Sequence, residues 1–152
     1  MKKVFLLLAL TTLLSCNKTE AYKETIKDFP ENRWTKKDVK TFKFKLKKDI
    51  EAAEVALHLS HVFDPQYTMV PLSVTITHPS GKEDNIFVNM PLKDASGESL
   101  SDCTGDYCDL TTTIVEETKF EKGEYKVTIQ NQYEHEYLPN VLAFGISVEH
   151  DN

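Results

Sequence analysis

The residues with the clearest chemical meaning stand near the amino terminus, where Leu13-Leu14-Ser15 is followed by Cys16. An aliphatic residue, then a small residue, then Cys is the pattern of the bacterial lipobox. In that chemistry the thiol takes a diacylglyceryl group, the signal is cut before the Cys, and the new amine is acylated by a fatty acid such as palmitate. One acyl chain binds a membrane only marginally, whereas two or more make the anchor durable. We therefore predict that Cys16 is the lipid attachment site and that residues 1–15 are a signal peptide.

The stretch before Cys16 has the properties of a secretory signal. Lys2 and Lys3 supply a basic start, and residues 4–14 carry no charge. A helix of about 11 residues covers roughly 16 Å, while a membrane span needs about 20 residues. This pattern favours a cleaved signal over a membrane span. The alternative is an ordinary signal followed by a Cys that has no function in lipidation.

Two further cysteines, Cys103 and Cys108, lie in the segment "SDCTGDYCDL". In an exported protein they are candidates for a disulfide, because a turn at Thr104-Gly105 can bring their Cα atoms within about 7 Å. A ring this small should stabilise the fold by no more than about 2–3 kcal/mol. The alternative is a calcium site, since three carboxylates in this segment could supply oxygen ligands: Asp102, Asp106 and Asp109. Their spacing is not that of an EF-hand loop, so we prefer the disulfide and expect no cofactor.

No pattern in the sequence indicates catalysis. His58 and His61 are three residues apart, and on a strand they would point to opposite faces, so they would not grip one metal ion. No Ser lies in a Gly-x-Ser-x-Gly elbow, and no nucleophile is paired with a base along the chain. We therefore predict that the protein is not an enzyme.

Lysines and the only Trp of the chain are candidates for an interaction surface. Lys43, Lys45 and Lys47 alternate with apolar residues. They could protect an edge strand from unwanted pairing, or dock onto anionic lipid headgroups or an acidic partner at about 1 kcal/mol per Lys. Trp34 is expected to seal one end of the core, or, if it is exposed, to stack on a sugar ring.

The overall charge excludes one class of partner. The chain has 152 residues with 18 Lys and Arg against 24 Asp and Glu, a net charge of −6, and loss of Lys2 and Lys3 makes it more negative. Nucleic acid would be repelled by such a protein, so we expect no nucleic-acid partner. The length suits a single domain.

Most of the chain alternates apolar and polar residues with period two, which is typical of strands with one buried face. Turn residues such as Asp64-Pro65 and His78-Pro79-Ser80-Gly81 separate the alternating segments. We predict an all-β fold, an antiparallel two-sheet β-sandwich of about seven strands spanning residues 34–152. Residues 16–33 are polar and are expected to form a tether, with a short helical turn at residues 22–26. The predicted strands lie in "VKTFKFKLKK", "EVALHLSHVF", "PLSVTITH", "NIFVNMPL", "DLTTTIVEE", "GEYKVTIQNQ" and "NVLAFGISVEH".

The order of several motifs resembles the gliding-motility lipoproteins of the GldH family. Cys16 is followed by a short charged segment, Phe29-Pro30, Trp34 and "DVKTFKFKL". Further along stand "VTITHPSGKEDN", "PLKDASGESL", "FEKGEYKVTIQNQ" and "YLPNVLAFGISVE". The likeness runs from Tyr22 to Glu149 and depends on the order and spacing of these motifs.

The resemblance implies a non-catalytic accessory or structural subunit of a gliding-motility-type apparatus at the bacterial outer membrane. Its partners would be the membrane, through the lipid on Cys16, and other envelope proteins of a motility or secretion apparatus. The alternative from another class is a glycan-binding β-sandwich module on the cell envelope.

Overall fold

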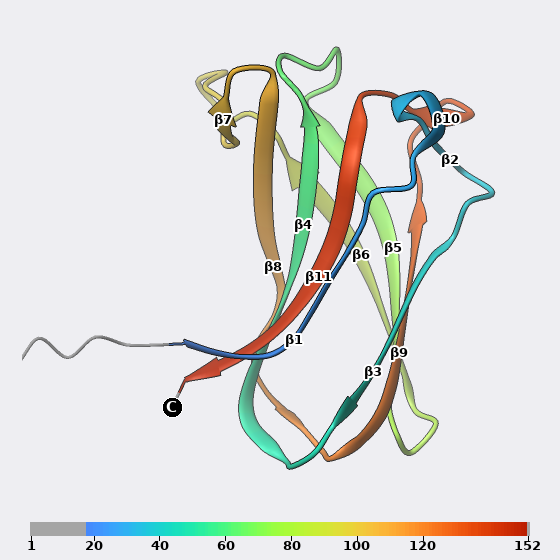
Figure 1. Cartoon of the computed structure of the whole chain (residues 1–152), viewed down its shortest axis with the longest axis vertical. Coiled ribbons are helices and arrows are strands. Elements are labelled where there is room, and N and C mark those ends of the chain that lie inside the picture. Colours follow the sequence, from blue (N-terminus) through green and yellow to red (C-terminus); the bar gives the residue numbers. More distant parts are fainter. Residues whose placement is uncertain (1–17, 152) are drawn as a thin grey trace, which may run out of the picture.

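The computed structural model describes residues 18–151 and consists of two antiparallel sheets packed face to face (Figure 1). The first sheet contains, in spatial order, β1 (Lys18–Ile26), β11 (Val141–Asp151), β4 (Ile50–Val62), β8 (Tyr107–Phe120) and β7 (Asp102–Thr104). The second contains β3 (Lys40–Leu46), β9 (Gly123–Asn131), β5 (Met69–Thr77) and β6 (Glu83–Pro91). A small two-stranded sheet joins β2 (Trp34–Thr35) to β10 (Tyr137–Leu138), next to a single 3-10 turn, η1 (Pro30–Asn32). Within residues 18–151, no helix is long and apolar enough to cross a membrane.

The predicted all-β antiparallel sandwich is confirmed, and all seven predicted segments lie in strands. Strand β3 shows why the pattern worked, because its residues alternate strictly between buried and exposed. Phe42 and Phe44 point into the core while Lys43 and Lys45 face solvent. Burying an aromatic side chain of this size stabilises the fold by about 1.5–3 kcal/mol, which fixes the face that each strand presents to the core.

The segment expected as a tether differs from the structure. The helical turn predicted at residues 22–26 is wrong, because residues 18–26 form the edge strand β1, paired along its length with β11. Tyr22 faces inward and stacks on Phe44, with ring centroids 4.4 Å apart. Gly145 of β11 permits the close approach, since a Cβ atom there would lie 2.7 Å from the carbonyl oxygen of Glu24. Backbone pairing, the packing of Tyr22 and Ile26 on the core and an ion pair between Lys18 and Glu54 thus hold a segment whose composition is mostly polar.

The sandwich has two ends that differ in their connections (Figure 1). We call the upper end in Figure 1 the disulfide end; it carries the connections 63–68, 92–101 and 105–106 together with β2 and β10. We call the lower end the lysine end; it carries the turns 47–49, 78–82 and 121–122.

Trp34 closes the core at the disulfide end. Its side chain is fully buried, its ring centroid lies 4.8 Å from that of Phe144 and 5.8 Å from that of Phe29, and its Nε1 donates to the carbonyl oxygen of Asp38 at 2.7 Å. This is the sealing role that we expected. The alternative of an exposed Trp34 on an interaction surface is wrong, because no part of the ring reaches solvent.

A ladder of stacked rings closes the core at the lysine end. Phe44 lies 5.2 Å from Tyr125, and Tyr125 lies 5.0 Å from Phe120, with the planes of each pair within 10° of parallel. The Oη of Tyr125 donates to the carbonyl oxygen of Glu121 at 2.9 Å, which ties the ladder to the turn between β8 and β9. Stacked pairs of this kind contribute about 0.5–1.5 kcal/mol beyond the burial of their area.

Candidate functional site

The disulfide predicted between Cys103 and Cys108 is present. The two residues lie directly opposite each other in the β7–β8 hairpin, with Cα atoms 4.0 Å apart. Gly105 opens the two-residue connection with φ of +63°, the positive value that the first central position of a type II′ turn requires. Local turn geometry therefore brings the two thiols together.

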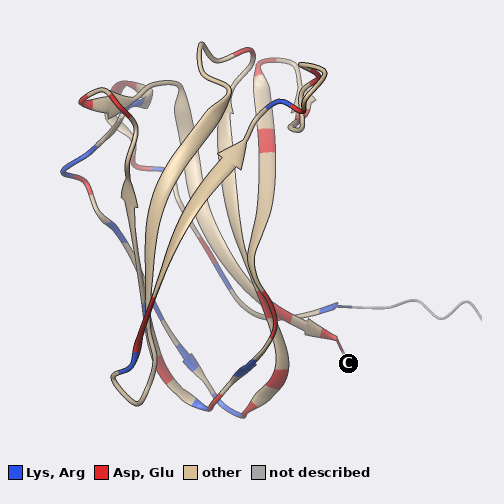
Figure 2. Ribbon diagram, turned by 180° about the vertical axis from the view of Figure 1, so that it is seen from behind, with Lys and Arg blue, Asp and Glu red and all other residues tan. Residues whose placement is uncertain are grey.

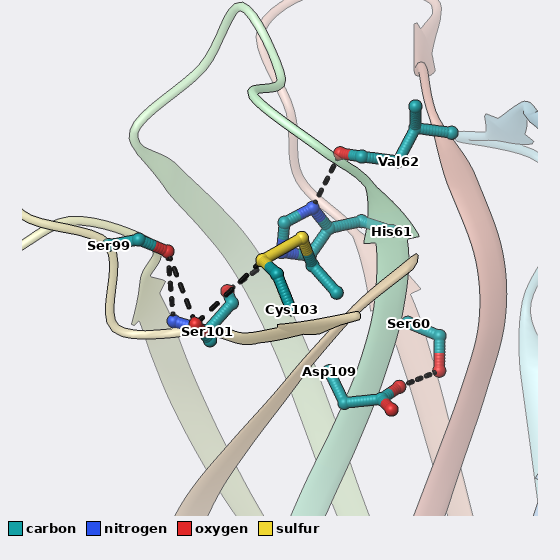
Figure 3. Close-up of a disulfide and its surroundings, with 8 residues drawn as sticks. Ser60, His61, Val62, Ser99, Ser101, Cys103 and Asp109 are labelled. Carbon is teal, nitrogen blue, oxygen red and sulfur yellow. Dashed lines mark hydrogen bonds between the residues drawn. A yellow bond between two sulfur atoms is a disulfide. The ribbon is translucent and has the colours of Figure 1, made fainter. Parts of the chain in front are cut away.

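His61 fastens a neighbouring loop to strand β4 (Figure 3). Its side chain is buried, Nδ1 donates to the carbonyl oxygen of Val62 at 2.9 Å, and Nε2 lies 2.8 Å from Oγ of Ser101. Because a carbonyl oxygen can only accept, the neutral tautomer carries its proton on Nδ1 and Ser101 donates to Nε2. The hydrogen bond from Ser101 thus holds the β6–β7 connection against β4.

The pairing of Ser101 with His61 brings together a hydroxyl and a base that the sequence separates by 40 residues. A nucleophilic serine must face a space in which a substrate can sit. A hollow of about 160 Å³ lies beside the disulfide, but Ser101 is not among the residues that line it. We interpret the pair as a structural contact.

The large apolar side chains exposed at the disulfide end include Phe63, Leu100 and Tyr107, with exposed fractions of 58%, 48% and 62%. We call these three residues the apolar tip. The backbone N–H of Phe63 donates to the carbonyl oxygen of Asp106 at 2.9 Å, so the β4–β5 and β7–β8 connections are joined. Exposed apolar side chains on neighbouring, fastened segments are typical of protein-binding surfaces, in which aromatic residues dominate the affinity.

The carboxylates of this end do not form a calcium cage. Asp102 and Asp109 face each other across β7 and β8, and Asp109 accepts a hydrogen bond from Oγ of Ser60. Asp106 occupies the turn, where its carbonyl oxygen accepts from Phe63. In residues 18–151, no group of three or more His, Cys, Asp or Glu side chains is placed to hold a metal ion.

The lysines of β3 lie on the outer face of the four-stranded sheet. Lys43 and Lys45 share this face, whereas Lys47 lies in the turn that follows. Strand pairing places Lys43 opposite Lys126 and Lys45 opposite Glu124, whose Oε1 is 3.7 Å from Nζ of Lys45. These four charged residues line a hollow of about 460 Å³.

Sequence inspection missed Lys126. Like charges directly opposite each other destabilise a strand pair, so the Lys43–Lys126 pair favours an anionic group between them. The only available signal was the period-two alternation around Tyr125 and Val127, which marks Lys126 as outward-facing but does not identify its neighbour.

His58 lies on the opposite face of β4 from His61, as the three-residue spacing predicts. Its ring nitrogens contact Oγ1 of Thr111 at 3.0 Å and Oγ of Ser147 at 2.8 Å. Burial, with a further contribution from Lys23, lowers the pKa of His58 below its ordinary value. The imidazole is therefore neutral at pH 7 and bridges two hydroxyls.

The structure defines a single all-β domain built as a two-sheet sandwich. A family model described as GldH lipoprotein matches residues 21–148. The chain belongs to the GldH lipoprotein family, which confirms the predicted resemblance. Membership implies a membrane-anchored location in the envelope.

Other comparisons add little. No curated protein matches the chain. Among solved structures, dimeric latent PorU from Porphyromonas gingivalis is 12% identical with a TM-score of 0.36; the match covers 88% of this chain, which spans only 13% of PorU. TmCBM61, solved in complex with β-1,4-galactotriose, is 12% identical with a TM-score of 0.31, and the match covers 89% of this chain and 88% of that one. Similarities this weak carry no argument about function.

The predicted lipid attachment site, Cys16, lies outside the described residues, so lipidation and the signal peptide remain predictions.

Proposed function

We propose that this protein is a lipid-anchored, non-catalytic accessory or structural subunit of a gliding-motility-type apparatus at the bacterial outer membrane. The observation that carries this proposal is the family match over residues 21–148, nearly the whole chain after the predicted cleavage site. The lipobox before Cys16 supports the anchor. The function is then positional, because the acyl chains hold the domain at the bilayer while its surface binds other envelope proteins.

The apolar tip is the surface best suited to a protein partner. Phe63 and Tyr107 present large rings on a backbone that need not rearrange on binding. The disulfide, His61 and the Phe63–Asp106 hydrogen bond already hold that backbone in place. Preorganisation of this kind lowers the entropic cost of association. Aromatic residues at the centre of an interface often contribute 2 kcal/mol or more each.

A crosslinking pull-down from intact cells tests this proposal. The variant Phe63→Ser/Tyr107→Ser should capture envelope proteins at least about 30-fold less than the native chain, which is the effect of a loss of 2 kcal/mol. Phe87→Ser is the matched control, because Phe87 is equally exposed but lies on the outer face of β6. Equal capture by the double variant and the control would rule out the apolar tip as the binding surface.

The same pull-down with Cys16→Ser tests the anchor. We expect the protein to leave the membrane fraction and the captured envelope proteins to be lost with it. Retention of Cys16→Ser in the membrane fraction would contradict lipid anchoring.

A glycan-binding function is the second candidate, and Phe87 is the residue that favours it. Its ring is 66% exposed on a face of hydroxyl and amide side chains, opposite Ser73 and two strands away from Gln130. An aromatic face with flanking polar groups can stack on a sugar and bind its hydroxyls. Retention on envelope polysaccharide that is lost in Phe87→Ala would support this function, and equal retention would exclude Phe87 from it.

A further inference from the structure

The predicted lipid and the folded domain are separated by very little chain. Strand β1 begins at Lys18, two residues after Cys16, and two extended residues reach at most about 7 Å. We infer that the sandwich rests directly on the bilayer through its lysine end, with Lys45, Lys47 and Lys48 contacting anionic phosphate headgroups. This inference rests on the proposed lipid anchor at Cys16.

The first evidence is a cationic hollow beside the start of β1. Its volume is about 260 Å³, and its polar and charged lining comes from Thr19, Lys45, Lys47, Lys48 and His150. No carboxylate side chain lines it. Because Thr19 is three residues after Cys16, an anchor at Cys16 holds this hollow close to the headgroup layer.

The second observation is that these lysines have few carboxylate partners within the protein. Within the part of the chain that the structure describes, no carboxylate lies within 4.0 Å of Nζ of Lys47 or Lys48, and Lys45 has only the exposed 3.7 Å contact with Glu124. Figure 2 shows that acidic segments also occur at this end.

Two acidic side chains at this end have partners of their own. Asp49 accepts the backbone N–H of Lys122 at 2.7 Å, and Glu51 contacts Nζ of Lys119 at 3.1 Å. Both line the adjoining hollow, together with Asp151, Lys48 and His150. The hollow beside the start of β1 thus has cationic side chains and no carboxylate, whereas the adjoining hollow is of mixed charge.

The arrangement sets the orientation of the whole domain. Strand β4 spans 13 residues between the two ends, so the apolar tip stands about 40 Å from the bilayer surface. Phosphate contacts at one end thus leave the opposite end free for a protein partner.

Lysine acetylation of the acylated protein in vesicles, followed by mass spectrometry, tests this orientation. In vesicles of phosphatidylcholine with phosphatidylglycerol, we expect Lys47 and Lys48 to react at least about fivefold more slowly than in phosphatidylcholine alone. Lys36 and Lys37, near β2 at the disulfide end, should react equally in both. High salt should remove the difference, because it screens the headgroups. Equal reactivity of Lys47 and Lys48 in the two vesicles, or protection of Lys36 and Lys37 instead, would overturn the inference.

A charge-matched pair of variants gives an independent measurement. Lys45→Gln/Lys47→Gln/Lys48→Gln should lose the phosphatidylglycerol-dependent protection of the amides of residues 46–50 from hydrogen exchange. Lys36→Gln/Lys37→Gln/Lys93→Gln removes the same charge from the other end and should keep it. Protection that persists in the first variant would contradict the inference while leaving the anchor intact. Failure of the native protein to float with the vesicles would instead overturn the lipid anchor, and this inference with it.

Discussion

The two ends of the sandwich achieve order by different means. The disulfide end carries a ten-residue connection, residues 92–101, and holds it with a covalent ring and the buried His61. The lysine end has short turns, and stacked rings below them suffice. The connection 92–101 has hydrogen bonds of its own, from Leu100 to Leu92 and from Asp94 to Glu98, and the bond between Ser101 and His61 attaches it to β4. The disulfide end therefore presents exposed apolar side chains among carboxylates on fastened segments, while the lysine end presents charged side chains on short turns.

The largest effect on stability should come from removing the buried Trp34 at the disulfide end. Trp34→Ala empties a fully buried site and should lower the free energy of unfolding by about 3–5 kcal/mol. Urea denaturation measures it, with Phe87→Ala as the exposed aromatic control, expected within about 0.5 kcal/mol of the native chain. An equally small change in the free energy of unfolding of Trp34→Ala would mean that the disulfide end does not depend on the buried Trp34.

Removal of the disulfide should affect the disulfide end only. Cys103→Ala/Cys108→Ala should lower the free energy of unfolding by about 2 kcal/mol, because the closed loop is short. Hydrogen exchange should accelerate at the amide of Phe63, which is bonded to Asp106, and remain unchanged at that of Lys122, which is bonded to Asp49 at the other end. Uniform acceleration at both amides would show that the two ends are not independent.

A matched pair of tyrosines offers a finer comparison. Tyr125 donates to Glu121 at the lysine end, and Tyr67 donates to the carbonyl oxygen of Pro139 at the disulfide end, both at 2.9 Å. Tyr125→Phe and Tyr67→Phe should each lower the free energy of unfolding by about 1 kcal/mol, because each leaves one carbonyl without its donor. Amide exchange should change only near the mutated end, and a change at both ends in either variant would contradict local control.

The smallest effect lies between the ends, at His58. Because burial lowers the pKa of His58 in the folded protein, the unfolded chain binds the proton more readily. The contribution of His58 to the free energy of unfolding should therefore be complete above the ordinary pKa of 6.5. It should decrease as the pH falls from there through the lowered pKa. Urea unfolding from pH 7.5 to 5.5 should show a shallower pH dependence in His58→Gln than in the native chain. Identical slopes would exclude His58 as a contributor.

Much of the fold was predictable because a strand with one buried face alternates apolar and polar residues along its own sequence. The alternation of Phe42, Phe44 and Leu46 with lysines predicted β3, and the Cys103–Cys108 spacing around a Gly predicted the ring. The shortest strands and the edge strand β1 show no such alternation. β2, β7 and β10 have two or three residues each, and β1 is mostly polar.

The candidate surfaces were harder to predict. Lys126 became relevant only when β9 paired with β3, and Phe63 and Tyr107 became neighbours only when β4 paired with β8. Trp34 could have been exposed or buried on sequence grounds, and packing against Phe29 and Phe144 decided that it is buried. Each of these outcomes depends on a contact between segments far apart in the chain.

The sequence by itself determined the strand periodicity, the place of the predicted lipid at Cys16 and the disulfide, because each depends on residues within about ten positions of one another. Only the tertiary structure decided that residues 18–26 are a strand, that the lysines next to it line a hollow, and that the apolar tip lies at the far end. The physical reason is that alternation specifies which face of a strand is buried, while the identity of its neighbour is set by backbone pairing and packing with distant segments.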